Sequence, residues 1–375
     1  MASSPRMKLL SDRGIKEAEA KRLIRIDPKP ENVQRQPASL DLKYSKIEDY
    51  EPMHGIGKSE TEYDFEGEDI LVPKYETDVR TETSMIYDPR IIKPYFELRS
   101  SMRRLGCFGK VPMINCAYEI GSMGPESLTT TLEIVNFSNF GIKLNKGDRI
   151  AQVMFTLDSP SLEEIKEHDI SYLSSGMGIE EFKQYAELDH GYSIDIPEEL
   201  SKLSSSGYFS FEPQLRSKHG MVEVHAGKRA RIIHSNKLID FDSRPKLSEI
   251  STDVDLPYRL KPGEFIDVDT VESMDLSRNV GILFYNEYTF QDFFRSLKTI
   301  KFRLENSGLL FKWDGWVDPG FKSPYFSRQP KILYPDKGRI IKPGDIMGFG
   351  QVFFFPNGVE RAYGSGDLSS QYQGK

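Results

Sequence analysis

The sequence predicts a mainly β protein in which two β barrels or sandwiches follow one another, with a few short helices. Short segments of alternating polar and apolar residues, such as 129–137 and 149–157, are separated by glycine-containing turns, a pattern typical of antiparallel strands. Helical periodicity is confined to a few stretches, and one turn-and-strand motif occurs in both halves. A chain of 375 residues is long enough for two or three domains with sizeable cores.

The first β domain is expected to span residues 1–155. Ser11 or Asp12 is a candidate N-cap for an amphipathic helix over residues 15–24. Three prolines follow the helix, and residues 39–42 (SLDL) then alternate as a half-buried strand does.

Residues 156–220 are expected to form a connector with two helices, at 161–170 and 179–188, separated by serine-rich stretches. The β pattern then resumes, and the second β domain is expected to span residues 221–375. In this domain, the sequence predicts that Asp267 and Asp269 lie on the solvent-facing side of a strand. It also predicts that residues 353–355 (FFF) belong to a buried terminal strand.

An internal repeat favours two related halves. Residues 144–155 and 341–353 both have an apolar residue, a lysine within the next two positions, Gly-Asp, an apolar run and Gln-Val. Glycine allows the tight turn that leads into each strand. A generic hairpin can have the same pattern, so the repeat supports duplication only together with other features.

Composition excludes several classes of protein. The net charge of −7 argues against a general nucleic-acid-binding surface, and no apolar run is long enough to span a membrane. The residues at the N-terminus do not predict a signal peptide. Two cysteines predict no disulfide scaffold, so we expect a cytoplasmic protein.

The segment 99–106 (RSSMRRLG) is the most informative motif. Its arginines and two serines can bind phosphate oxygens through charge-assisted hydrogen bonds. Further on, Glu133 lies between Leu132 and Ile134 and is a candidate general base. Together they indicate chemistry on a nucleotide. The alternative is a surface turn with solvated arginines and an ordinary strand glutamate.

The histidines and cysteines argue against a zinc-activated water. The nucleobase deaminases that use zinc carry an H-x-E and a P-C-x-x-C signature, and the sequence contains neither. Cys107 and Cys116 are too far apart in the sequence for such a pair. We therefore expect no protein-bound metal.

These motifs resemble those of the dCTP deaminase branch of the dUTPase-like superfamily, and the length resembles a tandem, two-copy form of it. The resemblance implies two β-clip or jelly-roll-type barrels in tandem and covers most of the chain except the connector. Its motifs are residues 9–15, 36–42, 99–106, 131–133, 262–265, 315–321 and 372–374.

The two halves depart from the family pattern in complementary ways. The second half has residues 301–306 (KFRLEN) in place of RSSMRR, and Arg328 stands where the family has its catalytic glutamate. The first half lacks the Asp-Pro-Gly turn of residues 318–320 and has no closing tail of its own. A site could therefore draw on both halves, within one chain or between chains.

The resemblance implies roles for residues of the first half. Glu133 would take a proton from the water that attacks C4 of cytosine, and would pass protons to N3 and the departing amine. Ser100 would help to hold that water, and Arg104 would orient the base or stabilise developing charge. Arg99 and Ser101 would bind phosphate oxygens.

In the second half, the resemblance implies that Asp318 fixes the sugar or the adjacent turn. Tyr363, Tyr372 and Lys375 would close over the nucleotide as a mobile tail. Gln371 stands where the family commonly has lysine, and Lys375 stands where it commonly has glutamine. The tail could alternatively be a disordered terminus.

The implied activity is hydrolytic deamination of dCTP to dUTP and ammonia, which supplies dUTP for thymidylate synthesis. Mg²⁺ would be carried by the triphosphate of the substrate, without zinc. The expected partners are dCTP and further copies of the chain, with a trimer favoured, and neither nucleic acid nor membrane. Asp318 also leaves open a dUTP diphosphatase or a bifunctional enzyme, and the divergence of the halves leaves open a non-catalytic nucleotide-binding sensor.

Overall fold

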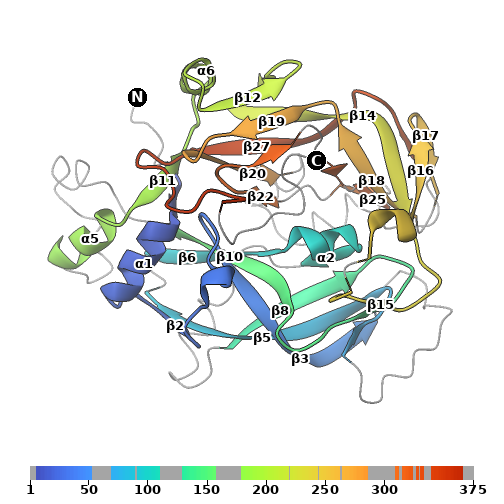
Figure 1. Ribbon diagram of the computed structural model, residues 1–375, viewed down its shortest axis with the longest axis horizontal. Coiled ribbons are helices and arrows are strands. Elements are labelled where there is room, and N and C mark those ends of the chain that lie inside the picture. Colours follow the sequence, from blue (N-terminus) through green and yellow to red (C-terminus); the bar gives the residue numbers. More distant parts are fainter. Residues whose placement is uncertain are drawn as a thin grey trace.

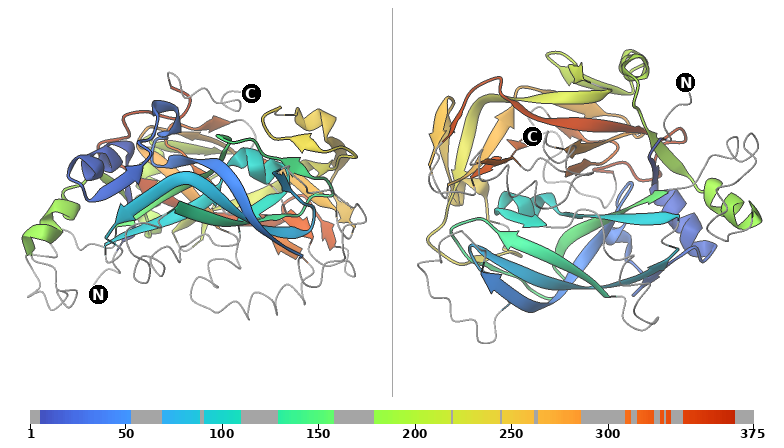
Figure 2. Two further views of the ribbon diagram at one scale, coloured as in Figure 1. Left: turned by 90° about the horizontal axis from the view of Figure 1, so that it is seen from below. Right: turned by 180° about the vertical axis from the view of Figure 1, so that it is seen from behind.

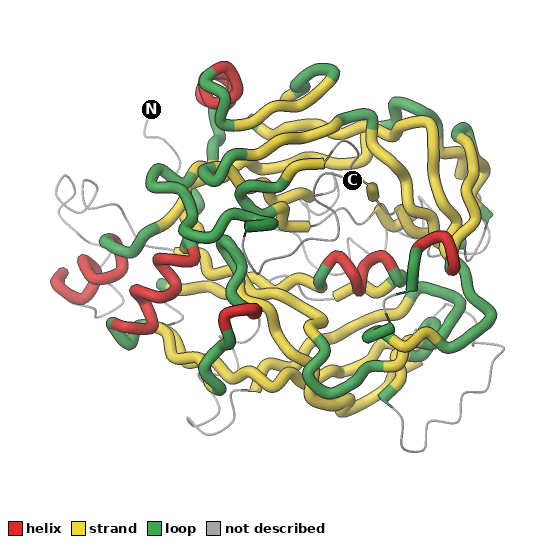
Figure 3. Tube along the Cα trace, in the orientation of Figure 1, coloured by secondary structure: helices red, strands yellow, loops and turns green. Residues whose placement is uncertain are grey.

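The computed structural model confirms a mainly β protein with a few short helices (Figures 1 and 3). It describes residues 6–52, 69–88, 91–109, 129–157, 179–218, 220–243, 245–261, 264–285, 309–311, 315–323, 327–328, 330–332 and 339–365. The first half of the chain forms one side of the molecule and the second half the other (Figures 1 and 2).

The first half contains β1 (Lys8–Leu10), α1 (Asp12–Ala20), β2 (Ile24–Asp27), the 3₁₀ helix η1 (Asn32–Gln34), β3 (Leu40–Pro52), β4 (Ile70–Leu71), β5 (Tyr75–Tyr87), β6 (Ile92–Leu98), α2 (Ser100–Arg104), β7 (Cys107–Gly109), β8 (Thr129–Asn136), β9 (Ile142–Lys143) and β10 (Arg149–Leu157). The hydroxyl of Ser11 accepts a hydrogen bond from the Gly14 amide, which confirms Ser11 as the N-cap of α1. Strands β2, β3 and β8 all pair with β5, and β3 and β6 pair with β10.

The predicted connector contains helix α5 (Ile179–Ala186), which confirms the second of its two helices. The helix predicted at 161–170 lies outside the described residues. A further helix, α6 (Pro197–Ser205), forms where the sequence indicated a serine-rich separator. Pro197 at its start, acidic residues in its first turn and the burial of Leu200 favour that helix.

The remaining elements of the second half are β11 (His190–Ser193), β12 (Phe209–Glu212), β13 (Ser217–Lys218), β14 (Met221–Ile233), β15 (Ile239–Asp240), η3 (Leu247–Glu249), β16 (Ser251–Asp255), β17 (Tyr258–Leu260), β18 (Phe265–Thr270), β19 (Ser273–Leu276), β20 (Val280–Tyr285), β21 (Leu309–Phe311), β22 (Gly315–Val317), β23 (Lys322–Ser323), β24 (Ser327–Arg328), β25 (Pro330–Ile332), β26 (Arg339–Ile341) and β27 (Ile346–Phe354). Leu200 of α6 and Phe209 of β12 pack with side chains of β14, β20 and β27. The domain boundaries at 155/156 and 220/221 stay predictions.

The two halves repeat one strand register. In the first half, β10 pairs with β3 from Arg149↔Lys43 to Val153↔Leu40, and the register shifts between Arg149 and Ala151. In the second, β27 pairs with β14 from Ile346↔His225 to Gly350↔Val222, again with a shift next to the first pair. The Gly-Asp turn therefore leads into equivalent strands in both halves.

The halves meet along an apolar interface that we call the seam. Leu9, Ala38, Tyr95 and Met154 of the first half pack there against residues of the second half: Leu283, Trp316, Phe353, Phe355 and Val359. Backbone pairing also crosses between the halves, because β1 pairs with β11 and β9 pairs with β15. Within the described residues, no helix is long and apolar enough to cross a membrane.

Candidate functional site

Helix α2, which carries most of the RSSMRRLG motif, lies on the side of the first half that faces the second half (Figures 1 and 2). Its Met102 is buried in the core of the first half, which orients the short helix. Ser100 is exposed, whereas Ser101 and Arg104 are half-buried. The predicted anion-binding hydroxyls therefore lie at the surface of a fixed turn.

The position of Arg99 is set by Asp41, a buried residue of β3. The Arg99 amide donates to the Ile150 carbonyl at 2.9 Å, and its guanidinium pairs with the Asp41 carboxylate. The same carboxylate oxygen lies 3.1 Å from Nη1 of Arg149 and 3.2 Å from Nε2 of Gln36. Asp41 is thus the residue of the SLDL motif that anchors Arg99.

The sequence analysis assigned no role to Asp41. A polar residue between Leu40 and Leu42 was the available signal, but its burial beside two guanidinium groups becomes visible only in the fold.

Asp318 of the second half comes close to Arg99 in the same chain. Its Oδ1 accepts a hydrogen bond from Nε1 of Trp316 at 2.8 Å, and the side chain is buried. Burial raises the pKa of Asp318 to about 7, the Trp316 hydrogen bond and Arg99 lower it, and the negative charge of Glu97 raises it. The structure therefore places two of the predicted substrate-binding residues, one from each half, within electrostatic reach of one another.

Tyr363 lies beside the turn that follows Asp318. Its amide donates to the Pro319 carbonyl at 2.8 Å, and its ring centroid is 5.6 Å from that of Phe321. Gly320 has a φ of +90°, and an added Cβ would lie 2.8 Å from the Cβ of Ala362, so glycine permits this close approach. Tyr372 and Lys375 lie outside the described residues.

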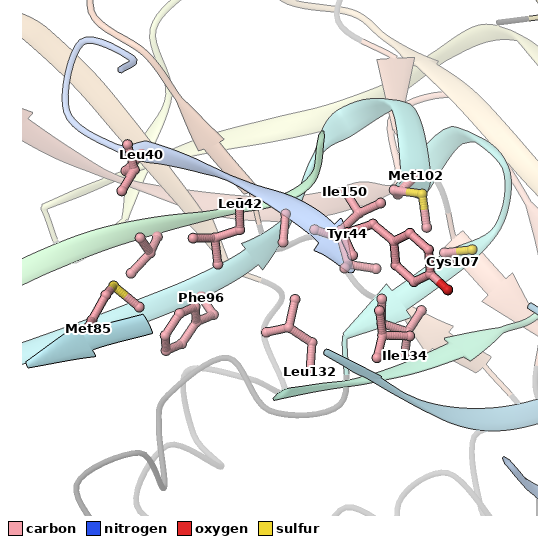
Figure 4. Close-up of a cluster of buried hydrophobic side chains, with 14 of the residues drawn as sticks. Leu40, Leu42, Tyr44, Met85, Phe96, Met102, Cys107, Leu132, Ile134 and Ile150 are labelled. Atoms are coloured by element: carbon pink, nitrogen blue, oxygen red, sulfur yellow. The ribbon is translucent and has the colours of Figure 1, made fainter. Parts of the chain in front are cut away.

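Glu133 does not join this group within one chain. Its neighbours Leu132 and Ile134 point into the core that also contains Met102 (Figure 4). Because side chains alternate along a strand, Glu133 points to the opposite face of β8. On that face it lies opposite Asp78 of β5, whose pKa is raised by burial and by the charge of Glu133.

In the second half, Arg328 lies in β24 and pairs with Val268 of β18. Whether it stands at the position of Glu133 stays a prediction.

Comparisons with known proteins first define the class. The structure matches the crystal structure of 2′-deoxycytidine 5′-triphosphate deaminase from Agrobacterium tumefaciens with a TM-score of 0.64 and 15% identity, over 94% of this chain and 99% of that one. The chain therefore has a dCTP deaminase fold.

Part of the sequence also matches a family model. Residues 9–157 match the dCTP deaminase-like model, which supports the resemblance found in the motifs of the first half. A curated relative from Corynebacterium efficiens, named "dCTP deaminase, dUMP-forming", is 24% identical over 184 residues, which is 47% of this chain and 87% of the relative.

Proposed function

We propose that the protein is a dCTP deaminase that adds water to C4 of cytosine and releases ammonia. The juxtaposition of Arg99 and Asp318 carries this proposal. Arg99, in a motif suited to phosphate oxygens, lies within electrostatic reach of a buried acid in a chain whose residues 9–157 match the dCTP deaminase-like family model. An anion-binding group and a neighbouring acid suit a substrate with both a triphosphate and a polar sugar and base.

Helix α2 binds the triphosphate and helps to organise the reacting water. Arg99 and Ser101 contact phosphate oxygens, Ser100 holds the water, and Arg104 stabilises charge that develops during attack. These donors suit phosphate oxygens rather than a bare cation. Mg²⁺ therefore enters with the triphosphate, whose oxygens supply most of its ligands.

Glu133 takes one proton from the attacking water and passes it to N3, and then passes the proton of the resulting hydroxyl to the leaving amine. Since Glu133 points away from α2 in its own chain, it serves the α2 of another copy, and the protein acts as a homo-oligomer, with a trimer favoured. We also place it in the cytoplasm, where it takes dCTP as its substrate.

The product distinguishes two versions of this function. We propose dUTP as the main product, whereas the name of the Corynebacterium relative favours dUMP. Incubation with dCTP and Mg²⁺, followed by chromatography for dUTP, dUMP and ammonia, separates them. Binding of dCTP without any product would instead support a nucleotide sensor.

Glu133→Gln tests the proton-transfer role. The amide cannot accept the water proton, so we expect ammonia release to fall by about 10²–10⁴-fold while calorimetry still detects dCTP binding. Glu76→Gln, at a partly exposed carboxylate on the neighbouring strand β5, is the control and should retain activity. Full turnover by Glu133→Gln would remove this residue from the mechanism.

A further inference from the structure

A buried carboxylate at the seam connects α2 to the second half, and the proposed chemistry does not use it. Oε2 of Glu97 accepts hydrogen bonds from Nη2 of Arg103 at 2.8 Å, from Nε2 of Gln152 at 2.9 Å and from the Trp316 amide at 2.8 Å. These donors come from α2, β10 and β22. One oxygen therefore holds three elements, and the third belongs to the other half.

Burying the Glu97 carboxylate in this arrangement costs free energy of folding, which argues against an incidental contact. The Glu97 side chain is 2% exposed. Within the described residues, its second oxygen, Oε1, is buried and accepts no hydrogen bond. A buried acceptor without a donor destabilises the folded state, and such groups call for a specific explanation.

The second half provides an internal comparison. Glu97 pairs with Gln152 across β6 and β10, and the equivalent pair across β20 and β27 is Leu283 with Gln351. The carboxylate is thus present in the half that carries the RSSMRRLG motif and replaced by leucine in the half where KFRLEN stands instead. Gln351 donates instead to the Ile194 carbonyl at 2.7 Å.

We propose that Glu97 is a positioning residue that fixes α2 relative to the Trp316–Asp318 segment, so that Arg99 and Asp318 contact the same nucleotide. Through Arg103 it fixes the last turn of α2, and through the Trp316 amide it fixes the strand that ends at Asp318. This inference rests on the proposed function for its kinetic consequence, but its structural basis can be measured without substrate.

Glu97→Gln tests the kinetic consequence. The amide keeps the size of the side chain but removes the charge beside Arg103. We expect the KM for dCTP to rise about 10- to 100-fold, the value of a lost charge-assisted hydrogen bond, with a much smaller change in kcat. The control is Glu272→Gln. Glu272 is equally buried and accepts two hydrogen bonds from His225, but it lies away from the seam.

A second measurement reports the geometry directly. In a Trp313→Phe background Trp316 is the only tryptophan, and its indole donates to Asp318, so its fluorescence follows the titration of Asp318. Glu97 raises the pKa of Asp318. Glu97→Gln should therefore move the midpoint to lower pH, and Glu272→Gln should leave it in place.

The outcomes separate this inference from the proposed function. An unchanged KM and an unchanged fluorescence midpoint in Glu97→Gln would overturn the role of Glu97. If the wild-type protein does not deaminate dCTP, the proposed function fails. The pH midpoint of the Trp316 fluorescence then still tests whether Glu97 acts on the Trp316–Asp318 segment. If Glu97→Gln does not fold, Glu97→Asp, which keeps the charge but shortens the reach, takes its place, with smaller shifts expected in both measurements.

Discussion

At the scale of single residues, burial gives similar carboxylates different behaviour. Asp41 and Asp318 are both buried near Arg99, but Asp41 pairs directly with Arg99 and with Arg149. Asp318 accepts a hydrogen bond from an uncharged indole and lies near the negative Glu97. Asp41 is therefore an anchor held by two guanidinium groups, whereas burial raises the pKa of Asp318 to about 7.

Asp318→Asn should change how stability depends on pH. The folded protein keeps Asp318 protonated up to a pKa of about 7, whereas the unfolded chain releases that proton near 3.8. The folded state therefore binds more protons between these values, and the free energy of unfolding falls as pH rises through this window. Asparagine does not titrate, so this contribution should disappear from the variant.

Urea unfolding at pH 5 and pH 8 measures this difference. The wild-type protein should lose more stability between the two pH values than Asp318→Asn does. Equal losses in both proteins would show that Asp318 does not titrate in this range.

At the scale of elements, the segment after β27 crosses to the first half and docks on α1. The buried carboxylate of Asp12 accepts hydrogen bonds from the amides of Glu360 and Arg361 at 3.0 and 2.9 Å. Nη1 of Arg361 donates to the Asn32 carbonyl at 2.7 Å, and Glu360 pairs with Lys16. This docking fixes the point from which the predicted closing tail extends.

Asp12→Ala should release this segment. The two amides lose a buried, charged acceptor, so the free energy of unfolding should fall by about 1–3 kcal/mol. Trypsin should cleave faster at Arg361, which limited proteolysis with mass spectrometry can follow. Asp253→Ala is the control, because the Asp253 side chain is 90% exposed; equal cleavage rates in the two variants would contradict the role of Asp12.

At the scale of the whole molecule, the groups of the proposed site lie on different faces. Arg99 and Asp318 lie within electrostatic reach of one another in one chain, while Glu133 lies on the opposite face of β8 from the core that contains Met102. The proposed chemistry would therefore require another copy to bring Glu133 to α2.

Mixing two inactive variants tests this arrangement. Arg104→Met removes a group of α2, and Glu133→Gln removes the base. If each site combines α2 of one chain with Glu133 of another, a mixed assembly refolded from equal amounts regains about a quarter of wild-type turnover by random pairing. If both residues act within one chain, the mixture stays inactive. Each variant refolded alone is the control.

The sequence predicted those elements that depend on local signals. Ser11 caps α1, α5 follows its helical periodicity, and residues 353–355 lie at the end of a buried strand, with Phe353 and Phe355 fully buried. The prediction from polar and apolar alternation was wrong for Asp267, which was expected to face solvent but has no exposed surface. Its partner Arg231 lies on β14, and cross-strand ion pairs of this kind are not visible in the spacing of one strand.

The sequence by itself determined the mainly β fold, the repeated Gly-Asp turn and the motifs of the site, because these depend on neighbours in the chain. The tertiary structure alone decided that Arg99 and Asp318 lie within electrostatic reach of one another while Glu133 points elsewhere. It also made Asp12, Asp41 and Glu97 important, since a carboxylate takes its role from the distant donors that burial places around it.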